Sequence, residues 1–151
     1  MNKSWIANGF TAANALFGGL SIMMSISGEY HVAAICILIA MAADAFDGRV
    51  ARALGTAGPM GVELDSLSDD ISFGVAAGAL MYSYQLRELG AFGFIPCALL
   101  GAFCAFRLAR FNVKVTSVHG YFEGLPCPTV GVIIACYVLS GVKIWNWLAM
   151  V

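Results

Sequence analysis

Five apolar segments follow one another along this chain of 151 residues. A helix needs about 20 apolar residues to cross the hydrocarbon of a bilayer, and turn formers or charges divide the sequence into spans at 8–27, 31–52, 60–85, 90–111 and 126–147. Apolar residues make up 60% of the chain and charged residues 11%, whereas soluble domains have about 45–50% and about 25%. We therefore expect an all-α, polytopic membrane helical bundle that forms a single domain over residues 1–151.

Charge and cysteine content exclude several other classes. The net charge of −1 leaves no basic surface for nucleic acid. The cysteines show no CxxC spacing and nearly all lie in apolar runs, so we expect thiols without a redox or metal role. These cysteines are Cys36, Cys97, Cys104, Cys127 and Cys136.

The basic residues predict the orientation of the spans. If the N-terminus is cytoplasmic, most of the Lys and Arg residues fall on the inner side, as the positive-inside bias requires. The inner set is Lys3, Arg49, Arg52, Arg107, Arg110 and Lys114, and the outer set is Arg87 and Lys143. We expect a multi-pass protein of the cell inner membrane whose N-terminus is cytoplasmic.

The aspartates are concentrated where the second span gives way to the third. Asp44 and Asp47 lie about 60° apart on one helix, because each residue turns the helix by about 100°. On the next helix, Asp65 and Asp69 share an arc of about 80° with Gly61. The turn at residues 55–59 allows the two helices to run antiparallel, so the two acidic faces are expected to meet.

Such a cluster is costly without a cation. An aspartate near the centre of a membrane costs about 2.5–3.5 kcal/mol, and neighbouring carboxylates repel one another. Oxygen ligands without His or thiolate suit Mg²⁺, Mn²⁺ or Ca²⁺, and Mg²⁺ is usually shared between carboxylates and substrate phosphates. The pattern therefore predicts a paired-metal site for phosphoryl transfer. The alternative is a solvated acidic end of two helices, balanced by Arg49 and Arg52 and without a metal.

The spacing of these residues resembles the motif of the CDP-alcohol phosphatidyltransferase family. The matching stretch reads Asp44-x2-Asp47-Gly48-x2-Ala51-Arg52-x8-Gly61-x3-Asp65-x3-Asp69. The resemblance implies a homodimeric membrane enzyme with six spans and an inner-face active site, which moves a phosphatidyl group from a CDP-linked donor to an alcohol and releases CMP. Since the sequence accounts for five spans, a missing sixth span is one interpretation.

The resemblance also implies roles for individual residues. Asp44, Asp47 and Asp65 would bind two divalent cations, Mg²⁺ or Mn²⁺, and Asp69 would be both a ligand and the general base. The residues expected to bind the nucleotide or donor are Asn8, Thr11, Asn14, Gly48, Ala51, Arg52 and Gly61. Three alternatives stay open: helix packing for the glycines, topology for Arg52, and hydrogen bonds between helices for the polar residues of the first span.

Two further stretches resemble the phosphatidylserine synthase branch of the family. They are Ser68-Asp69-x2-Ser72-Phe73-Gly74-Val75, and Arg107-Leu108-Ala109-Arg110-Phe111-Asn112 together with Phe122-x-Gly124-Leu125-Pro126-x-Pro128. The implied donor is CDP-diacylglycerol and the implied acceptor is L-serine. Arg107 and Arg110, one helical turn apart, would bind the serine carboxylate, or else anchor the inner side or bind a lipid phosphate. Asp70 lies off the motif face, where we expect it to be solvated or paired with an arginine.

Other functions are compatible with parts of this pattern. A sibling enzyme that uses glycerol 3-phosphate or inositol phosphate would share the metal site. A cation channel or transporter would also place acids in a bundle, but the outer halves of the second and third spans, 31–40 and 74–84, hold none. A non-catalytic assembly subunit is the third class. The sequence leaves open whether transfer is direct or passes through a covalent phosphatidyl-enzyme.

Overall fold

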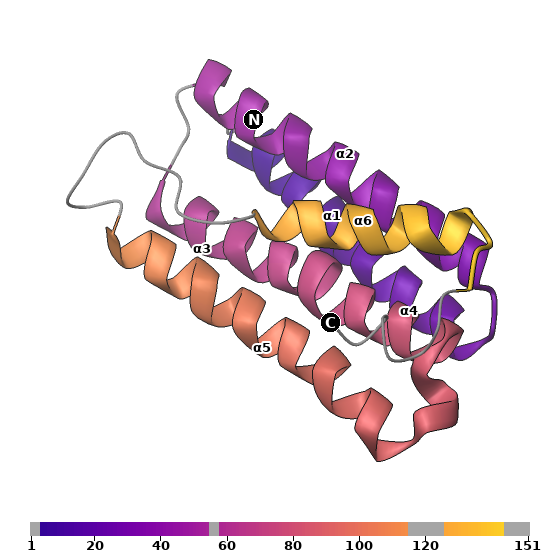
Figure 1. The fold of residues 1–151 in the computed structure, drawn as a ribbon. Coiled ribbons are helices and arrows are strands. Elements are labelled where there is room, and N and C mark those ends of the chain that lie inside the picture. Colours follow the sequence, from indigo (N-terminus) through magenta and orange to yellow (C-terminus); the bar gives the residue numbers. More distant parts are fainter. Residues whose placement is uncertain (1–3, 55–57, 115–125, 144–151) are drawn as a thin grey trace.

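The chain forms an antiparallel bundle of helices in a computed structural model that describes residues 4–54, 58–114 and 126–143 (Figure 1). These residues contain no strand, which confirms the all-α expectation. The elements are α1 (Ser4–Ile26), α2 (Tyr30–Leu54), α3 (Pro59–Asp69), the π-helical segment η1 (Asp70–Val75), α4 (Ala76–Tyr84), the 3₁₀ turn η2 (Leu86–Leu89), α5 (Ala91–Lys114) and α6 (Cys127–Leu139).

The α3, η1 and α4 segments follow one another directly and form one continuous helical rod (Figure 1). Together with α1, α2, α5 and α6, the described residues thus form five helical rods, one for each predicted span. Gly28 and Gly90 make two of the turns between rods with φ angles of 84° and 55°, which favour glycine. By length and composition, three helices in the described residues are able to cross a membrane: Asn8–Ile26, Tyr30–Val50 and Ala91–Val113.

Two of the predicted boundaries are wrong. The fifth span was expected to continue to residue 147, but α6 ends at Leu139. Gly141 follows with a φ angle of 67°, a left-handed conformation that ends helices. The fourth span was expected to end at residue 111, but α5 continues to Lys114.

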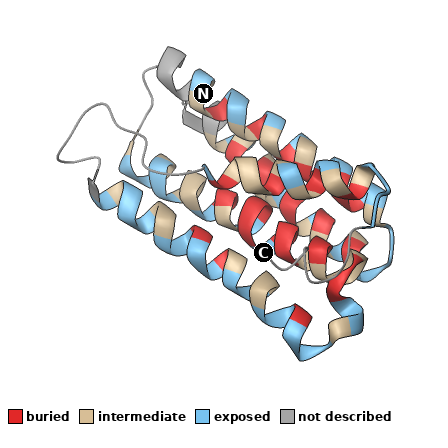
Figure 2. Ribbon diagram, in the orientation of Figure 1, coloured by how far each residue is buried: buried red, intermediate tan, exposed pale blue. Residues whose placement is uncertain are grey.

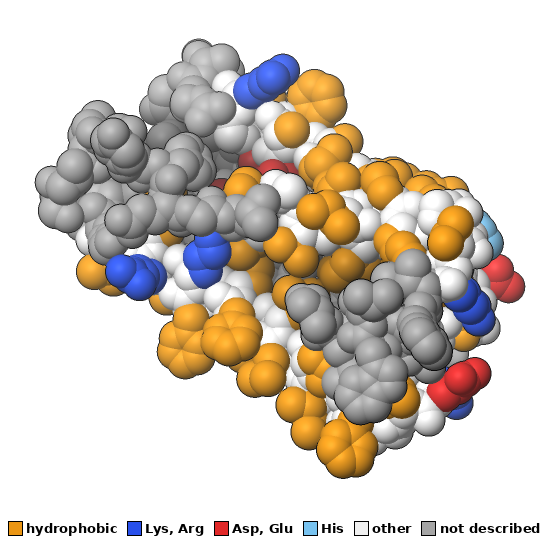
Figure 3. Space-filling view, viewed as in Figure 1, with side chains coloured by type: hydrophobic (Ala, Val, Ile, Leu, Met, Phe, Trp, Pro, Cys, Tyr) orange, Lys and Arg blue, Asp and Glu red, His pale blue; other side chains and the backbone are white. Residues whose placement is uncertain are grey.

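The core lies where α2, η1, α4 and α6 meet. Ile37, Phe73, Leu80 and Val138 are almost completely buried there, and Figure 2 shows the buried residues on the inward sides of these rods. In contrast, α5 is largely exposed, and hydrophobic side chains such as Phe106 cover its outer face (Figure 3). An exposed apolar face on a span-length helix is expected to contact lipid.

An aromatic cluster closes one end of the bundle. The Tyr84 ring packs edge to face against Tyr30, with centroids 5.6 Å apart, and against Tyr137, with centroids 6.0 Å apart. The Lys143 ammonium lies over the Tyr84 ring, 5.5 Å from its centroid, and the Tyr137 hydroxyl donates a hydrogen bond to Gln85 Oε1. These contacts join α2, α4 and α6 at this end.

Close packing of α1 on η1 depends on a glycine. A Cβ atom at Gly18 would lie 2.9 Å from the Ser72 Cα and would also collide with the Ser72 hydroxyl oxygen. A Cβ atom at the adjacent Gly19 would meet no described atom within 4 Å. The two glycines therefore differ in function although they are neighbours in the sequence.

We predict that Gly18→Ala destabilises the protein by about 1–3 kcal/mol, because the added methyl group forces α1 away from η1. Gly19→Ala is the matched control, and it should be neutral or slightly stabilising because alanine favours a helix over glycine. Thermal unfolding of both variants in the same detergent measures the difference. Equal unfolding temperatures for the two variants would contradict this account of the packing.

Candidate active site

The predicted acidic faces do meet. Ligand oxygens of Asp44 and Asp47 from α2 and of Asp65 from α3 all lie within 4.8 Å of one another. Asp69, the last residue of α3, brings its carboxyl group against that of Asp44. Asp47 and Asp69 are buried, with exposed fractions of 5% and 7%. The helical periodicity therefore predicted the convergence of Asp44, Asp47 and Asp65, with Asp69 beside Asp44.

Two side chains of α1 donate hydrogen bonds to this cluster. The Thr11 hydroxyl donates to Asp47 Oδ2 over 2.9 Å, and Asn14 Nδ2 donates to Asp69 Oδ1 over 3.0 Å. Asn14 is completely buried. Thr11 and Asn14 therefore both make hydrogen bonds between helices, which is the alternative role that the sequence left open for them. A role for them or for the half-buried Asn8 in donor binding stays a prediction.

The π-helical segment begins directly after Asp69. Within it, the Ser72 hydroxyl donates to the backbone oxygen of Asn14 over 2.9 Å and so ties η1 to α1. Single π turns inside helices are frequent at functional sites. This segment was not predicted from the sequence, because its composition resembles that of an ordinary apolar helix and one irregular turn barely changes the periodicity.

The donor atoms of the cluster fit a hard divalent cation. All four side chains offer carboxylate oxygens, the ligands that Mg²⁺ and Mn²⁺ prefer. Asp65 Oδ1 is buried and has no hydrogen-bond partner among the described residues. A buried carboxylate oxygen without a partner is costly, and a cation bound between the aspartates would remove both this cost and their mutual repulsion.

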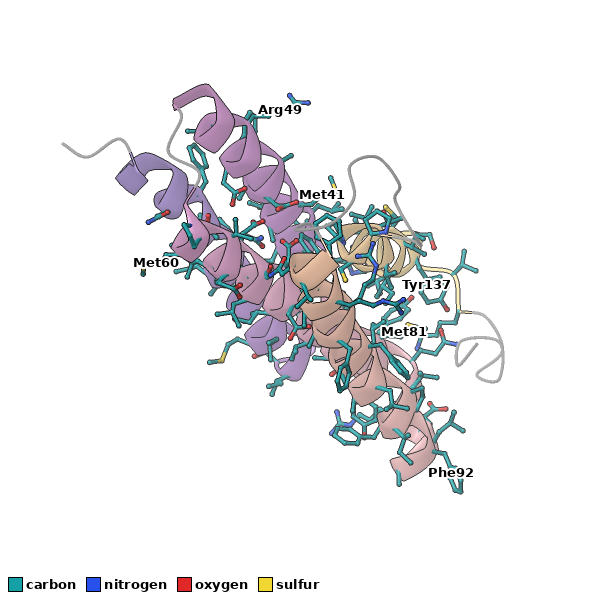
Figure 4. The ribbon with its side chains drawn as sticks, turned by 90° about the vertical axis from the view of Figure 1, so that its left-hand side faces the viewer. Met41, Arg49, Met60, Met81, Phe92 and Tyr137 are labelled. Atoms are coloured by element: carbon teal, nitrogen blue, oxygen red, sulfur yellow. The ribbon has the colours of Figure 1, made fainter. Side chains whose placement is uncertain are left out.

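The remaining motif residues have different surroundings. No described atom lies within 4 Å of a Cβ built at Gly61, so the space beside it is open rather than filled by a neighbouring helix. Gly48 is half-buried on α2. The side chains of Ala51 and Arg52 lie outside the described residues. Arg49 is exposed and points away from the bundle near the end of α2 (Figure 4).

The two arginines expected to bind the acceptor are not equivalent. Arg107 is half-buried, and its Nη1 donates to the Cys127 sulfur over 3.5 Å, whereas Arg110 is exposed. Figure 3 shows basic side chains at the end of the molecule where α5 finishes. Asn112 Nδ2 donates to the Ser66 hydroxyl over 3.0 Å and joins α5 to α3 next to Asp65. The contacts of Cys127 and Asn112 were not predicted from the sequence, because both depend on the packing of distant segments.

The fold and the site together define an integral membrane protein with a carboxylate-lined site between its first helices. A sequence profile of the CDP-alcohol phosphatidyltransferase family matches residues 4–151. The chain therefore belongs to the CDP-alcohol phosphatidyltransferase family, as the motif at residues 44–69 indicated.

Several curated relatives are similar to this chain. A CDP-diacylglycerol–serine O-phosphatidyltransferase from Helicobacter pylori (strain ATCC 700392 / 26695) is 38% identical over 133 residues, which cover 87% of this chain and 56% of the relative. An archaetidylserine synthase from Methanothermobacter thermautotrophicus is 40% identical over 130 residues, with coverages of 85% and 55%. The Bacillus subtilis CDP-diacylglycerol–serine O-phosphatidyltransferase is 38% identical over 122 residues, with coverages of 80% and 68%. The matched regions thus span little more than half the length of the first two relatives.

Proposed function

We propose that this protein transfers a phosphatidyl group from CDP-diacylglycerol to L-serine, giving phosphatidylserine and CMP. The observation that carries the proposal is the convergence of Asp44, Asp47 and Asp65 within 4.8 Å in a member of the CDP-alcohol phosphatidyltransferase family. The relatives named as CDP-diacylglycerol–serine O-phosphatidyltransferases support serine as the acceptor.

In this proposal Asp44, Asp47, Asp65 and Asp69 hold two divalent cations, Mg²⁺ or Mn²⁺. When bound, these cations neutralise the diphosphate of the donor and the charge that develops on CMP. Asp69 accepts the proton of the serine hydroxyl. The hydroxyl oxygen then bonds to the phosphorus that carries the diacylglycerol, and the bond from that phosphorus to CMP breaks.

The hydrogen-bond donors on α1 orient the carboxylates for cation binding and proton transfer. Asn14 donates to Oδ1 of Asp69 and so orients this carboxylate. Thr11 fixes Asp47 in the same way. Hydrogen bonds of this kind to metal ligands typically change metal affinity by about 10–100-fold.

The substrates and the membrane complete the proposal. Residues 1–151 form one membrane domain, with the N-terminus and the site on the cytoplasmic side of the inner membrane, and the protein is a homodimer. The diacylglycerol tails of the donor stay in the lipid. Serine enters from the cytoplasm, and its carboxylate binds Arg107, with Arg110 nearby.

The direct test is an assay of the purified full chain in mixed micelles with CDP-diacylglycerol and Mn²⁺ or Mg²⁺. Labelled L-serine, glycerol 3-phosphate and inositol phosphate are offered separately, and CMP and lipid product are measured. We expect product with serine and none after removal of divalent cations. Product with glycerol 3-phosphate in place of serine would reject the acceptor, and cation flux in liposomes without CMP release would reject the enzyme.

Asp69→Asn should lower the transfer rate by at least about 100-fold, because a general base commonly contributes about 10²–10⁴-fold. The same variant should still bind CDP-diacylglycerol, whereas Asp65→Asn should weaken cation and nucleotide binding together. Glu63→Gln, at an exposed acid of the same helix, is the matched control and should behave as wild type. A normal rate in Asp69→Asn would remove this residue as the base.

Thr11→Val should weaken Mn²⁺ activation by about tenfold or more, because Asp47 loses the hydrogen bond from the Thr11 hydroxyl while the side-chain volume stays nearly the same. Thr11→Ser keeps the hydroxyl and should preserve most of the affinity. The Mn²⁺ concentration that gives half-maximal activity measures both variants. If valine and serine gave the same value, the hydroxyl would have no part in holding the ligand.

A further inference from the structure

Asp70 is the one aspartate that the proposed reaction does not use. It begins η1 directly after Asp69 but faces α5, where the Cys104 thiol lies against its carboxyl group. Its Oδ1 lies 2.7 Å from the position of a Cβ at Gly74, so the missing side chain of that glycine makes room for the oxygen. Oδ1 is buried and has no hydrogen-bond partner among the described residues. The expectation that Asp70 is solvated is therefore wrong for this oxygen.

A positive charge is held at the same corner of the bundle. Arg107 lies one helical turn beyond Cys104 on α5 and donates to the Cys127 sulfur at the start of α6. The Cys127 sulfur in turn lies 3.9 Å from the Cys104 backbone oxygen. The Cys127 sulfur therefore joins the Arg107 side chain to the part of α5 at Cys104, which lies beside Asp70 at Gly74.

The two opposite charges do not neutralise each other by contact. In the described part of the chain, Arg107 donates to a sulfur rather than to a carboxylate, and Asp70 Oδ1 accepts no hydrogen bond. Charged groups in such surroundings are costly unless they are paired. A ligand that carries both an ammonium and a carboxylate would pair with each of them.

We propose that Asp70 and Arg107 form a subsite for a zwitterionic acceptor, in which Asp70 binds the α-ammonium group and Arg107 binds the α-carboxylate. This inference rests on the proposed function and adds a specificity-determining residue to it. Asp70 selects acceptors that carry an amino group, and Arg107 selects those that carry a carboxylate.

The position of the subsite suits the chemistry. Asp69 precedes Asp70 in the chain, so the proposed base and the proposed ammonium ligand are neighbouring residues. A 2-amino-3-hydroxy acid carries its hydroxyl one carbon away from the carbon that bears both charged groups. In this proposal Asp70 and Arg107 bind the charged groups, and the hydroxyl is offered to Asp69.

The test compares L-serine with 3-hydroxypropanoate, which keeps the hydroxyl and carboxylate but lacks the ammonium group. In Asp70→Asn, the KM for serine should rise by at least about tenfold, because a hydrogen bond to a charged group is lost. The inhibition constant of 3-hydroxypropanoate against serine, the KM for CDP-diacylglycerol and the Mn²⁺ activation should stay at wild-type values. Glu63→Gln is the matched control and should change none of these constants.

Arg107→Gln supplies the reciprocal test and does not depend on the folding of the Asp70 variant. It should abolish inhibition by 3-hydroxypropanoate but keep inhibition by ethanolamine, which has the ammonium and hydroxyl groups without the carboxylate. KM and inhibition constants report only on folded enzyme, so partial unfolding does not imitate these patterns.

Several outcomes would overturn the subsite. The first is an unchanged KM for serine in Asp70→Asn. The second is a rise in the inhibition constant of 3-hydroxypropanoate in this variant that equals the rise in the KM for serine. The third is a shift in the Mn²⁺ activation of this variant, because that shift would assign Asp70 to the cation site. In each case the wild-type enzyme still uses serine and the proposed function stands. If the wild-type chain releases no CMP in response to serine, the proposed function itself falls, and the subsite falls with it.

Discussion

Four carboxylates lie close together inside an apolar bundle, where they repel one another and lose the water that would solvate them. Several contacts of the fold offset this cost in free energy. The acidic faces of α2 and α3 meet in the bundle. Thr11 and Asn14 of α1 supply hydrogen bonds to the Asp47 and Asp69 carboxylates. Such contacts compensate buried charge only in part. An oxygen-lined cluster of this kind is therefore most stable with bound cations, which links the fold of the first three rods to the proposed chemistry.

Much of this arrangement follows from local patterns in the sequence. Apolar length and turn residues predict the five rods, because a bilayer requires helices of a certain length. The 3.6-residue period places Asp44 and Asp47 on one face and Asp65 and Asp69 on another. Both inferences need only information within a single helix, and the structure confirms that the faces converge.

What escaped prediction depends on contacts between distant segments. The π turn at η1, the particular pairing of Asn14 with Asp69, and the contact of Arg107 with Cys127 all arise from packing between helices. The early end of α6 reflects the left-handed conformation of Gly141, which a glycine in an apolar run permits but does not require. A single sequence carries little information about such choices.

The aromatic cluster of Tyr30, Tyr84 and Tyr137 lies at the other end of the bundle from Arg49 and Arg107. The aromatic contacts and the proposed carboxylate site therefore lie at opposite ends of the bundle. The exposed turn at Arg87 and Glu88, near the aromatic cluster, is consequently a suitable attachment point for a fluorophore or an affinity handle. A reporter placed there would follow the folding of the rods in a bilayer while the carboxylates remain untouched.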